Sequence, residues 1–198
     1  MNRTLFGIFL CLMLTLGLAI ASVPSTSISC KVSAGSAYGT GAVLPDGYVL
    51  TAAHVVSEVV NGRTVKFPFP TVIFDDGSRR TGRIERFDKR RDLALLNTRH
   101  RFQGVRLGET PQRGDTVWVI GCSGDLFNSL KRGVVSNLGE YMVIDALLSP
   151  GDSGGPVVNE DGELVGISDA MLLSCGGFHY TYGLCVTTEN VKNFLQGK

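Results

Sequence analysis

Three residues of this chain, His54, Asp92 and Ser153, have the types and the order needed for nucleophilic catalysis. Ser153 stands in the stretch SPGDSGGPVV, among three glycines and two prolines. A serine hydroxyl is a poor nucleophile at neutral pH, so an adjacent base must take its proton as it attacks. Histidine suits that task because its pKa of about 6.5 lies near neutral pH, and a carboxylate can hold the imidazole in the required tautomer. The sequence therefore predicts an activated serine, if folding brings the three together.

The choice of base and acid rests on what surrounds each candidate. His54, in LTAAHVV, lies where an expected strand ends and a short helical turn begins, whereas His100, in NTRHR, lies in a polar turn typical of a surface histidine. Asp92 opens the apolar run DLALL, where an acid at the edge of a strand can be buried with a partner. Asp75 and Asp76 precede a glycine and are better explained as turn formers.

A different serine hydrolase also fits the local pattern. Residues 151–155 match G-x-S-x-G, the nucleophile elbow of α/β-hydrolases, and Asp161 and His179 follow in the order that such an enzyme needs. That elbow must lead from a strand into a helix, however. Here Gly154, Gly155 and Pro156 follow the serine, and this run is a poor helix start. The pattern therefore favours the order His54, Asp92, Ser153.

The elements that must position these residues are mostly strands. From Ile28 onward, short β-rich runs alternate with turn pairs such as Asn61-Gly62 and Asp161-Gly162, which are preferred in two-residue hairpins. Residues 188–197, with a cap at Thr188, have the pattern of an amphipathic helix. We therefore expect an all-β protein, closed or nearly so, with a short C-terminal helix.

The N-terminal residues 1–21 have the pattern of a signal peptide. Arg3 precedes an apolar run that ends in Ala19-Ile20-Ala21, the small-x-small pattern of a cleavage site. An uncleaved membrane anchor is the alternative, because the run approaches the length that spans a bilayer. Both interpretations predict export, to a secreted or periplasmic protein if the signal is cleaved and to a membrane-anchored one if it is not. Residues 22–198 are expected to form a single domain.

The cysteines suggest disulfides. Cys30, Cys122, Cys175 and Cys185 remain after signal cleavage, and an even number in an exported chain is typical of paired cysteines. Three connectivities are open. A local Cys175–Cys185 pair is slightly favoured because the two bracket a candidate hairpin. No metal site is predicted, since Cys175 and His179 lack a second pair of ligands.

The charge balance excludes some partners. The chain has 19 Lys and Arg against 18 Asp and Glu, a net charge of +1. That balance does not favour nucleic acid or an anionic membrane. Seven basic residues between Arg79 and Arg91 are interleaved with Glu85 and Asp88, which indicates a solvated strand face.

Taken in order, TAAHVV, DLALL and PGDSGGPVV resemble the three catalytic motifs of the trypsin/chymotrypsin-like serine endopeptidases, nearest to a stand-alone HtrA (Deg)-type protease domain without a PDZ domain. The resemblance implies two six-stranded Greek-key β-barrels, the first over about residues 28–100 and the second over about 101–187. His54 and Asp92 would come from the first barrel and Ser153 from the second. It also implies proteolysis through an acyl-enzyme, without a cofactor.

The resemblance extends to the substrate site. Gly151 and Ser153 would supply the backbone N–H groups of an oxyanion hole. Protein or peptide substrate would bind as an extended strand along Ser168, Asp169 and Ala170. Leu147 would form the base of an apolar specificity pocket, which implies a small or medium apolar residue before the cleaved bond.

Two features stay open at this stage. In the trypsin-like enzymes the acid before the nucleophile pairs with a newly cut N-terminus, but no IVGG-like stretch precedes Cys30, so the partner of Asp152 is undetermined. The alternative function is a catalytically silent trypsin-like fold that binds proteins. Its members usually lose a catalytic residue, whereas this chain keeps all of them. We expect a monomer without stable membrane association after signal cleavage.

Overall fold

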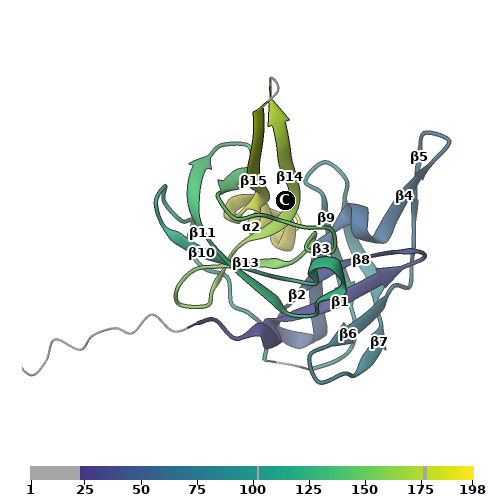
Figure 1. Cartoon of the computed structure of the whole chain (residues 1–198). Coiled ribbons are helices and arrows are strands. Elements are labelled where there is room, and N and C mark those ends of the chain that lie inside the picture. The colour runs from purple at the N-terminus through teal and green to yellow at the C-terminus, as the bar shows by residue number, and fades with distance from the viewer. Residues whose placement is uncertain (1–22, 102, 176–177) are drawn as a thin grey trace, which may run out of the picture.

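The computed structural model describes residues 23–101, 103–175 and 178–198, and the side chains of these residues outside 172–181. The expected signal peptide, residues 1–21, lies outside the described residues. Strands dominate, and they form two curled units that lie side by side (Figure 1).

The first unit contains a sheet in the order β7-β6-β1-β2-β3-β9-β8 and a separate two-stranded hairpin, β4-β5. The strands are β1 (Ser29–Ala34), β2 (Ala37–Val43), β3 (Tyr48–Ala52), β4 (Ser57–Val60), β5 (Arg63–Lys66), β6 (Thr71–Phe74), β7 (Arg79–Thr81), β8 (Arg83–Asp88) and β9 (Leu93–Asn97). The 3₁₀ turns η1 (Thr26–Ile28), η2 (Pro45–Gly47) and η3 (Ala53–Val56) link or precede them.

The large sheet of the first unit has seven strands, whereas six were expected, because one strand is divided at a glycine. β7 and β8 lie at opposite ends of the sheet order, yet only Gly82 separates them in the chain. The Gly82 N–H donates to the carbonyl of Pro70 at 2.8 Å, in register with the neighbouring Thr71–Thr81 pair, so the pairing with β6 extends to this bend. One long strand is thus divided at Gly82, and its two halves border both edges of the curled sheet.

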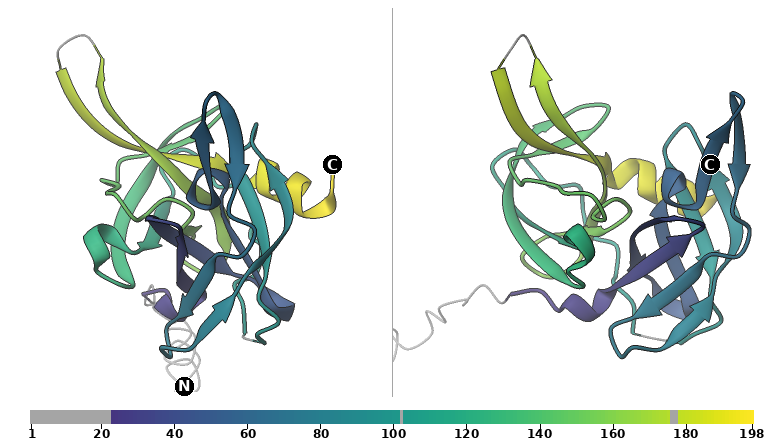
Figure 2. Two further views of the ribbon diagram at one scale, coloured as in Figure 1. Left: turned by 90° about the vertical axis from the view of Figure 1, so that its right-hand side faces the viewer. Right: turned by 45° about the vertical axis from the view of Figure 1, so that its right-hand side comes forward.

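The second unit is a closed barrel in the order β10-β11-β12-β15-β14-β13, with antiparallel pairing throughout. Its elements are β10 (Thr116–Gly121), the 3₁₀ turn η4 (Ser123–Asp125), β11 (Ser129–Leu138), β12 (Met142–Ile144), β13 (Pro156–Val158), β14 (Leu164–Cys175) and β15 (Phe178–Thr187). β14 and β15 continue beyond the barrel as a projecting hairpin (Figure 2).

The C-terminal helix α2 spans Thr188–Gln196 and has a cap at each end. The Thr187 hydroxyl accepts from the Asn190 N–H, so the cap lies one residue before the expected Thr188. Gly197 ends the helix with φ of 77°. Val191 and Phe194 pack into an apolar cluster that also contains Leu50 of β3 and Ile167 of β14. The helix therefore helps to hold the two units together.

The cysteines do not form the expected pairs. Cys30, Cys122 and Cys185 are buried free thiols, and burial raises the pKa of each. The Cys175–Cys185 pair is wrong because the hairpin register places Cys175 opposite Phe178 and Cys185 opposite Ser168. Cys185 is fully buried in the core of the second barrel. The side chain of Cys175 lies outside the described residues.

The structure confirms the predicted all-β architecture with two barrel-like units and a short C-terminal helix. Across the described parts of the chain, no helix has the length and apolar character needed to cross a membrane.

Candidate active site

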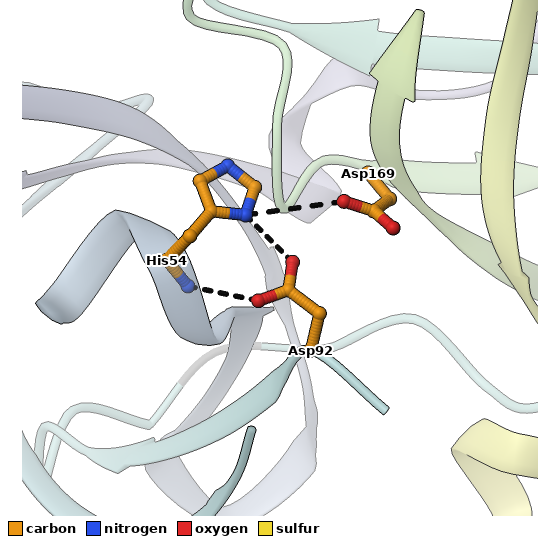
Figure 3. Close-up of side chains that lie close together, drawn as sticks. All are labelled: His54, Asp92 and Asp169. Carbon is orange, nitrogen blue, oxygen red and sulfur yellow. Dashed lines mark hydrogen bonds and ion pairs between the residues drawn. The ribbon is translucent and has the colours of Figure 1, made fainter. Parts of the chain in front are cut away.

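His54 lies in η3, the turn that follows β3. Its neighbours Ala53, Val55 and Val56 are buried, which fixes the turn against the first sheet, while 49% of the His54 side chain is exposed. The Val55 and Val56 side chains pack into the apolar core of that unit. The apolar residues on either side thus hold the turn, and the imidazole projects from it (Figure 3).

Asp92 immediately precedes β9 and holds His54 at two points. Its Oδ1 accepts from the backbone N–H of His54 at 2.9 Å, and its Oδ2 lies 2.6 Å from the imidazole Nδ1 (Figure 3). Asp92 has φ of 54°, a left-handed conformation that Asp and Asn tolerate better than most residues. The hydrogen bond to Asp92 raises the pKa of His54, against the opposing effect of burial.

Ser153 lies across from them, on the turn that precedes β13. Ser153 and His54 line the same cavity, of about 350 Å³. The Ser153 Oγ donates to the backbone carbonyl of Asp169 at 2.9 Å rather than to the imidazole. The structure thus brings His54 and Ser153 to one cavity, with Asp92 behind His54, but leaves the serine hydroxyl turned toward β14.

The turn around Ser153 leaves two backbone donors unused. Gly151 has φ of 98°, and within the described chain neither its N–H nor that of Ser153 donates to a protein acceptor. Thr40 of β2 secures this turn to the first unit: its N–H donates to the Ser153 carbonyl at 2.8 Å and its hydroxyl to the Gly151 carbonyl at 2.7 Å. The two free N–H groups therefore lie on a turn fixed from both units.

Asp169 adds an acid beside the expected pair. Its Oδ1 lies 3.9 Å from the His54 Nδ1, and its side chain is 15% exposed (Figure 3). Burial and then the charge of Asp92 raise the pKa of Asp169 from 3.8 to about 6. These three side chains offer atoms within 4.8 Å of one another that could hold a metal ion. The His54 Nδ1 is already hydrogen-bonded to Asp92, however, which favours a hydrogen-bonded cluster of these three side chains over a metal site.

Replacing Asp169 by Asn should raise the stability of the protein in a pH-dependent way. Because the folded protein binds the Asp169 proton more tightly than the unfolded chain, this carboxyl's contribution to the free energy of unfolding falls as the pH rises from 3.8 to about 6. The Asp169→Asn variant has no carboxyl at this position, so its free energy of unfolding does not undergo that decrease. Its Tm relative to the parent should therefore be higher at about pH 7.5 than at about pH 3.5, as measured by thermal unfolding.

Asp161→Asn provides the matched control, because it makes the same chemical change in an exposed hairpin turn. Its Tm difference from the parent should stay constant over the same pH range. Asp169→Asn should also move the acid limb of any activity profile to lower pH, since the Asp169 charge helps to raise the pKa of His54. Identical pH dependence of the two variants would contradict the assignment.

The cavity beside Ser153 differs from the expected pocket by one residue. Leu148, only 4% exposed, lines the cavity together with Ala170 and Met171, whereas the Leu147 side chain is 55% exposed and is not part of the lining. Two acids lie in the segments expected to form the pocket walls, and Asp169 lines the cavity. The other, Asp145, instead accepts from the Val134 N–H at 2.5 Å.

Ser168 is placed in support of the nucleophile turn. Its side chain is fully buried, and its hydroxyl donates to the Asp152 carbonyl at 2.6 Å and accepts from the Gly155 N–H at 3.0 Å. Its backbone N–H and carbonyl already pair with the Gly155 carbonyl and the Gly154 N–H. The part of the expected substrate strand that borders the cavity begins at Asp169.

Two residues near Ser153 were missed at the level of sequence. Thr40 lies in a run of small residues without a motif. Lys131 forms an ion pair with Asp152, which answers the open question about that acid. The available signal was the alternation of β11, since Lys131 shares a strand face with the buried Gly133 and Val135. A lysine at such a position needs a buried partner.

One protein-family model matches a region of the chain that includes strands of both units. A model described as "Trypsin-like peptidase domain" matches residues 39–167, from β2 through His54 and Ser153 into β14. This chain belongs to the trypsin-like peptidase domain family. The matched region contains all three of the residues predicted for catalysis.

Relatives of this trypsin-like domain carry protease names. A Do-like protease of Arabidopsis thaliana is 29% identical over 181 residues, covering 82% of this chain and 42% of that protein. A DegP-like periplasmic serine endoprotease of Brucella suis is 33% identical over 156 residues, covering 71% of this chain and 29% of that protein. The chain thus spans less than half the length of these relatives.

The solved structure of an HtrA-type protease with a tripeptide has the same fold. It superposes with a TM-score of 0.77 at 22% sequence identity, covering 89% of this chain and 62% of that one. The resemblance of this trypsin-like domain to the HtrA-type branch is therefore confirmed at the level of family and fold.

Proposed function

We propose that this protein is a serine endopeptidase in which Ser153 attacks the peptide bond, His54 is the general base and Asp92 orients His54. The observation that carries the proposal is the paired contact of Asp92 with both the backbone and the imidazole of His54, beside a cavity that also contains Ser153. With its Nδ1 proton bonded to Asp92, His54 would keep Nε2 unprotonated and able to accept the serine proton.

The proposed first step is acylation. The Ser153 hydroxyl rotates from the Asp169 carbonyl toward His54, which takes its proton as Oγ bonds to the substrate carbonyl carbon. His54 then gives that proton to the leaving amine as the peptide C–N bond breaks. Water, activated by the same imidazole, releases the acyl group. A loose contact before substrate binds is common in catalytic hydrogen bonds.

The charge that develops on the substrate oxygen would be stabilised by the N–H groups of Gly151 and Ser153. Both are unused by the described protein and lie on one fixed turn. Fixed donors of this kind act without reorganisation when charge forms, which is why they contribute so much to catalysis.

The substrate would add as a strand to β14 from Asp169 onward, with an apolar side chain in the 350 Å³ cavity. Leu148, Ala170 and Met171 supply an apolar lining. Asp169, which also lines the cavity, would disfavour an acidic residue in that position. A small or medium apolar residue before the cleaved bond is therefore the specificity we propose.

Export is proposed from the signal-like residues 1–21. Residues 22–198 are proposed to form a single domain made of two barrel units that meet near residue 101. The DegP-like relatives, described as periplasmic, agree with an exported protein.

Reaction with a fluorophosphonate probe tests the proposed function. The purified protein should be labelled on Ser153, because an activated serine attacks the phosphorus as it would a carbonyl. Ser153→Ala should abolish labelling, and His54→Ala should reduce its rate at least ~10³-fold because the hydroxyl loses its base. Mass spectrometry of the adduct gives the site, and the rate of labelling gives the activation.

His100→Ala is the matched control, since His100 packs against Phe74, away from the cavity. It should be labelled at the parent rate. A folded parent protein that resists the probe would reject the enzyme and favour a catalytically silent fold that binds proteins.

A further inference from the structure

The carboxylate of Asp152 is the most buried charge near the proposed nucleophile, at 1% exposure. Its Oδ1 accepts from the Ser123 hydroxyl at 2.6 Å, and its Oδ2 accepts from the Ser149 N–H at 2.7 Å. Lys131 completes the set with an ion pair to Oδ2. A buried carboxylate is tolerated when it is paired and hydrogen-bonded in this way.

The position of Asp152 in the chain links these contacts to the proposed oxyanion hole. Asp152 joins Gly151 to Ser153, the two residues whose N–H groups would form the oxyanion hole. Its backbone N–H donates to the Ser149 carbonyl at 3.0 Å, and its carbonyl accepts from Gly155 at 2.9 Å. With both its backbone and its side chain held, Asp152 fixes the peptide planes on either side of it.

The structure contains a socket for this carboxylate. Gly121, the last residue of β10, lies against it so closely that a Cβ there would overlap Oδ1 and come within 3.0 Å of the Asp152 Cγ. Lys131 reaches the socket from β11 and also donates to the Ser123 hydroxyl at 2.5 Å. The cation that balances Asp152 thus comes from the barrel wall itself and not from the start of the chain.

We propose that Lys131 is a positioning residue that acts through Asp152 and holds the turn 151–153 in the form that presents both N–H groups to the substrate oxygen. The inference rests on the proposed serine-protease function. It implies that the site is assembled on folding, without a newly cut N-terminus to balance Asp152.

Lys131→Met and the double variant Lys131→Met/Asp152→Asn test this inference. The single variant leaves a buried carboxylate without its cation, so we expect kcat on a peptide substrate to fall ~10²-fold or more while KM changes less than about threefold. The double variant removes the unbalanced charge, and its amide oxygen can still accept from the Ser149 N–H while its NH2 can donate to the Ser123 hydroxyl oxygen. It should recover at least ~10-fold in kcat over the single variant.

Arg132→Met, the adjacent residue on the exposed face of β11, is the matched control and should keep the parent kcat. A Lys131→Met protein within threefold of the parent, or a double variant no better than the single, would overturn the inference. If Lys131→Met does not fold, the double variant decides alone: folded and labelled by fluorophosphonate supports the inference, and unfolded or inert rejects it. An inert parent protein instead rejects the proposed function.

Discussion

Replacing Asp92 by Asn is expected to lower kcat about 10⁴-fold while the protein stays folded. The amide nitrogen of the substituted side chain would face the His54 Nδ1, where Asp92 Oδ2 now lies at 2.6 Å. Because that nitrogen can only donate, the imidazole would carry its proton on Nε2 and could not accept the serine proton. Peptidase kinetics and fluorophosphonate labelling measure the loss.

The Asn substitution is chosen because it preserves the local backbone. Asp92 has φ of 54°, which Asn also tolerates, and the Asn oxygen can still accept from the His54 N–H. Thermal unfolding should therefore place the variant within a few degrees of the parent. A loss of activity smaller than tenfold in a folded variant would show that Asp92 does not set the tautomer.

Replacing Gly151 by Ala should lower kcat ~10²–10³-fold and also destabilise the protein. Gly151 has φ of 98°, where a side chain costs roughly 1–3 kcal/mol. A Cβ there would also overlap the carbonyl oxygen of Cys122 and lie 2.7 Å from the Tyr38 ring. Since a backbone carbonyl cannot move aside cheaply, the turn must shift and its N–H group would leave the substrate oxygen.

Gly114→Ala separates the two causes. Gly114 has nearly the same conformation, φ of 95°, but nothing lies within 4 Å of a Cβ built there. Its effect on the free energy of unfolding should contain the conformational cost alone, and its kcat should equal that of the parent. Equal losses of activity in the two variants would sink the oxyanion role of Gly151.

The sequence was informative where local chemistry and position in an element agree. His54 and Asp92 stand at the ends of strands that pair directly, β3 with β9. Their contact therefore follows once the strands are recognised. The glycines and prolines around Ser153 likewise exclude a helix there, which separated the trypsin-like order from the α/β-hydrolase order. The two barrels followed from the spacing of turns and from the resemblance.

Features set by long-range packing were not accessible in the same way. An even number of cysteines predicts pairs only statistically, whereas the register of β14 and β15 puts Cys185 in the core. In the loop before Ser153 no strand alternation fixes which leucine points inward, so Leu147 was taken where Leu148 lines the cavity. The partner of Asp152 depends on where β11 passes, which only the folded barrel determines.

The contacts of Thr40 bear on the stage of folding at which such an enzyme would become active. This residue of β2 bonds to the carbonyls of both Gly151 and Ser153, so the first unit helps to shape the nucleophile turn of the second. Before the two units have docked, His54 would not yet lie beside Ser153, and Thr40 would not yet hold the turn 151–153. Such a half-assembled molecule could not cut its neighbours, so newly made chains would be protected from one another until folding is complete.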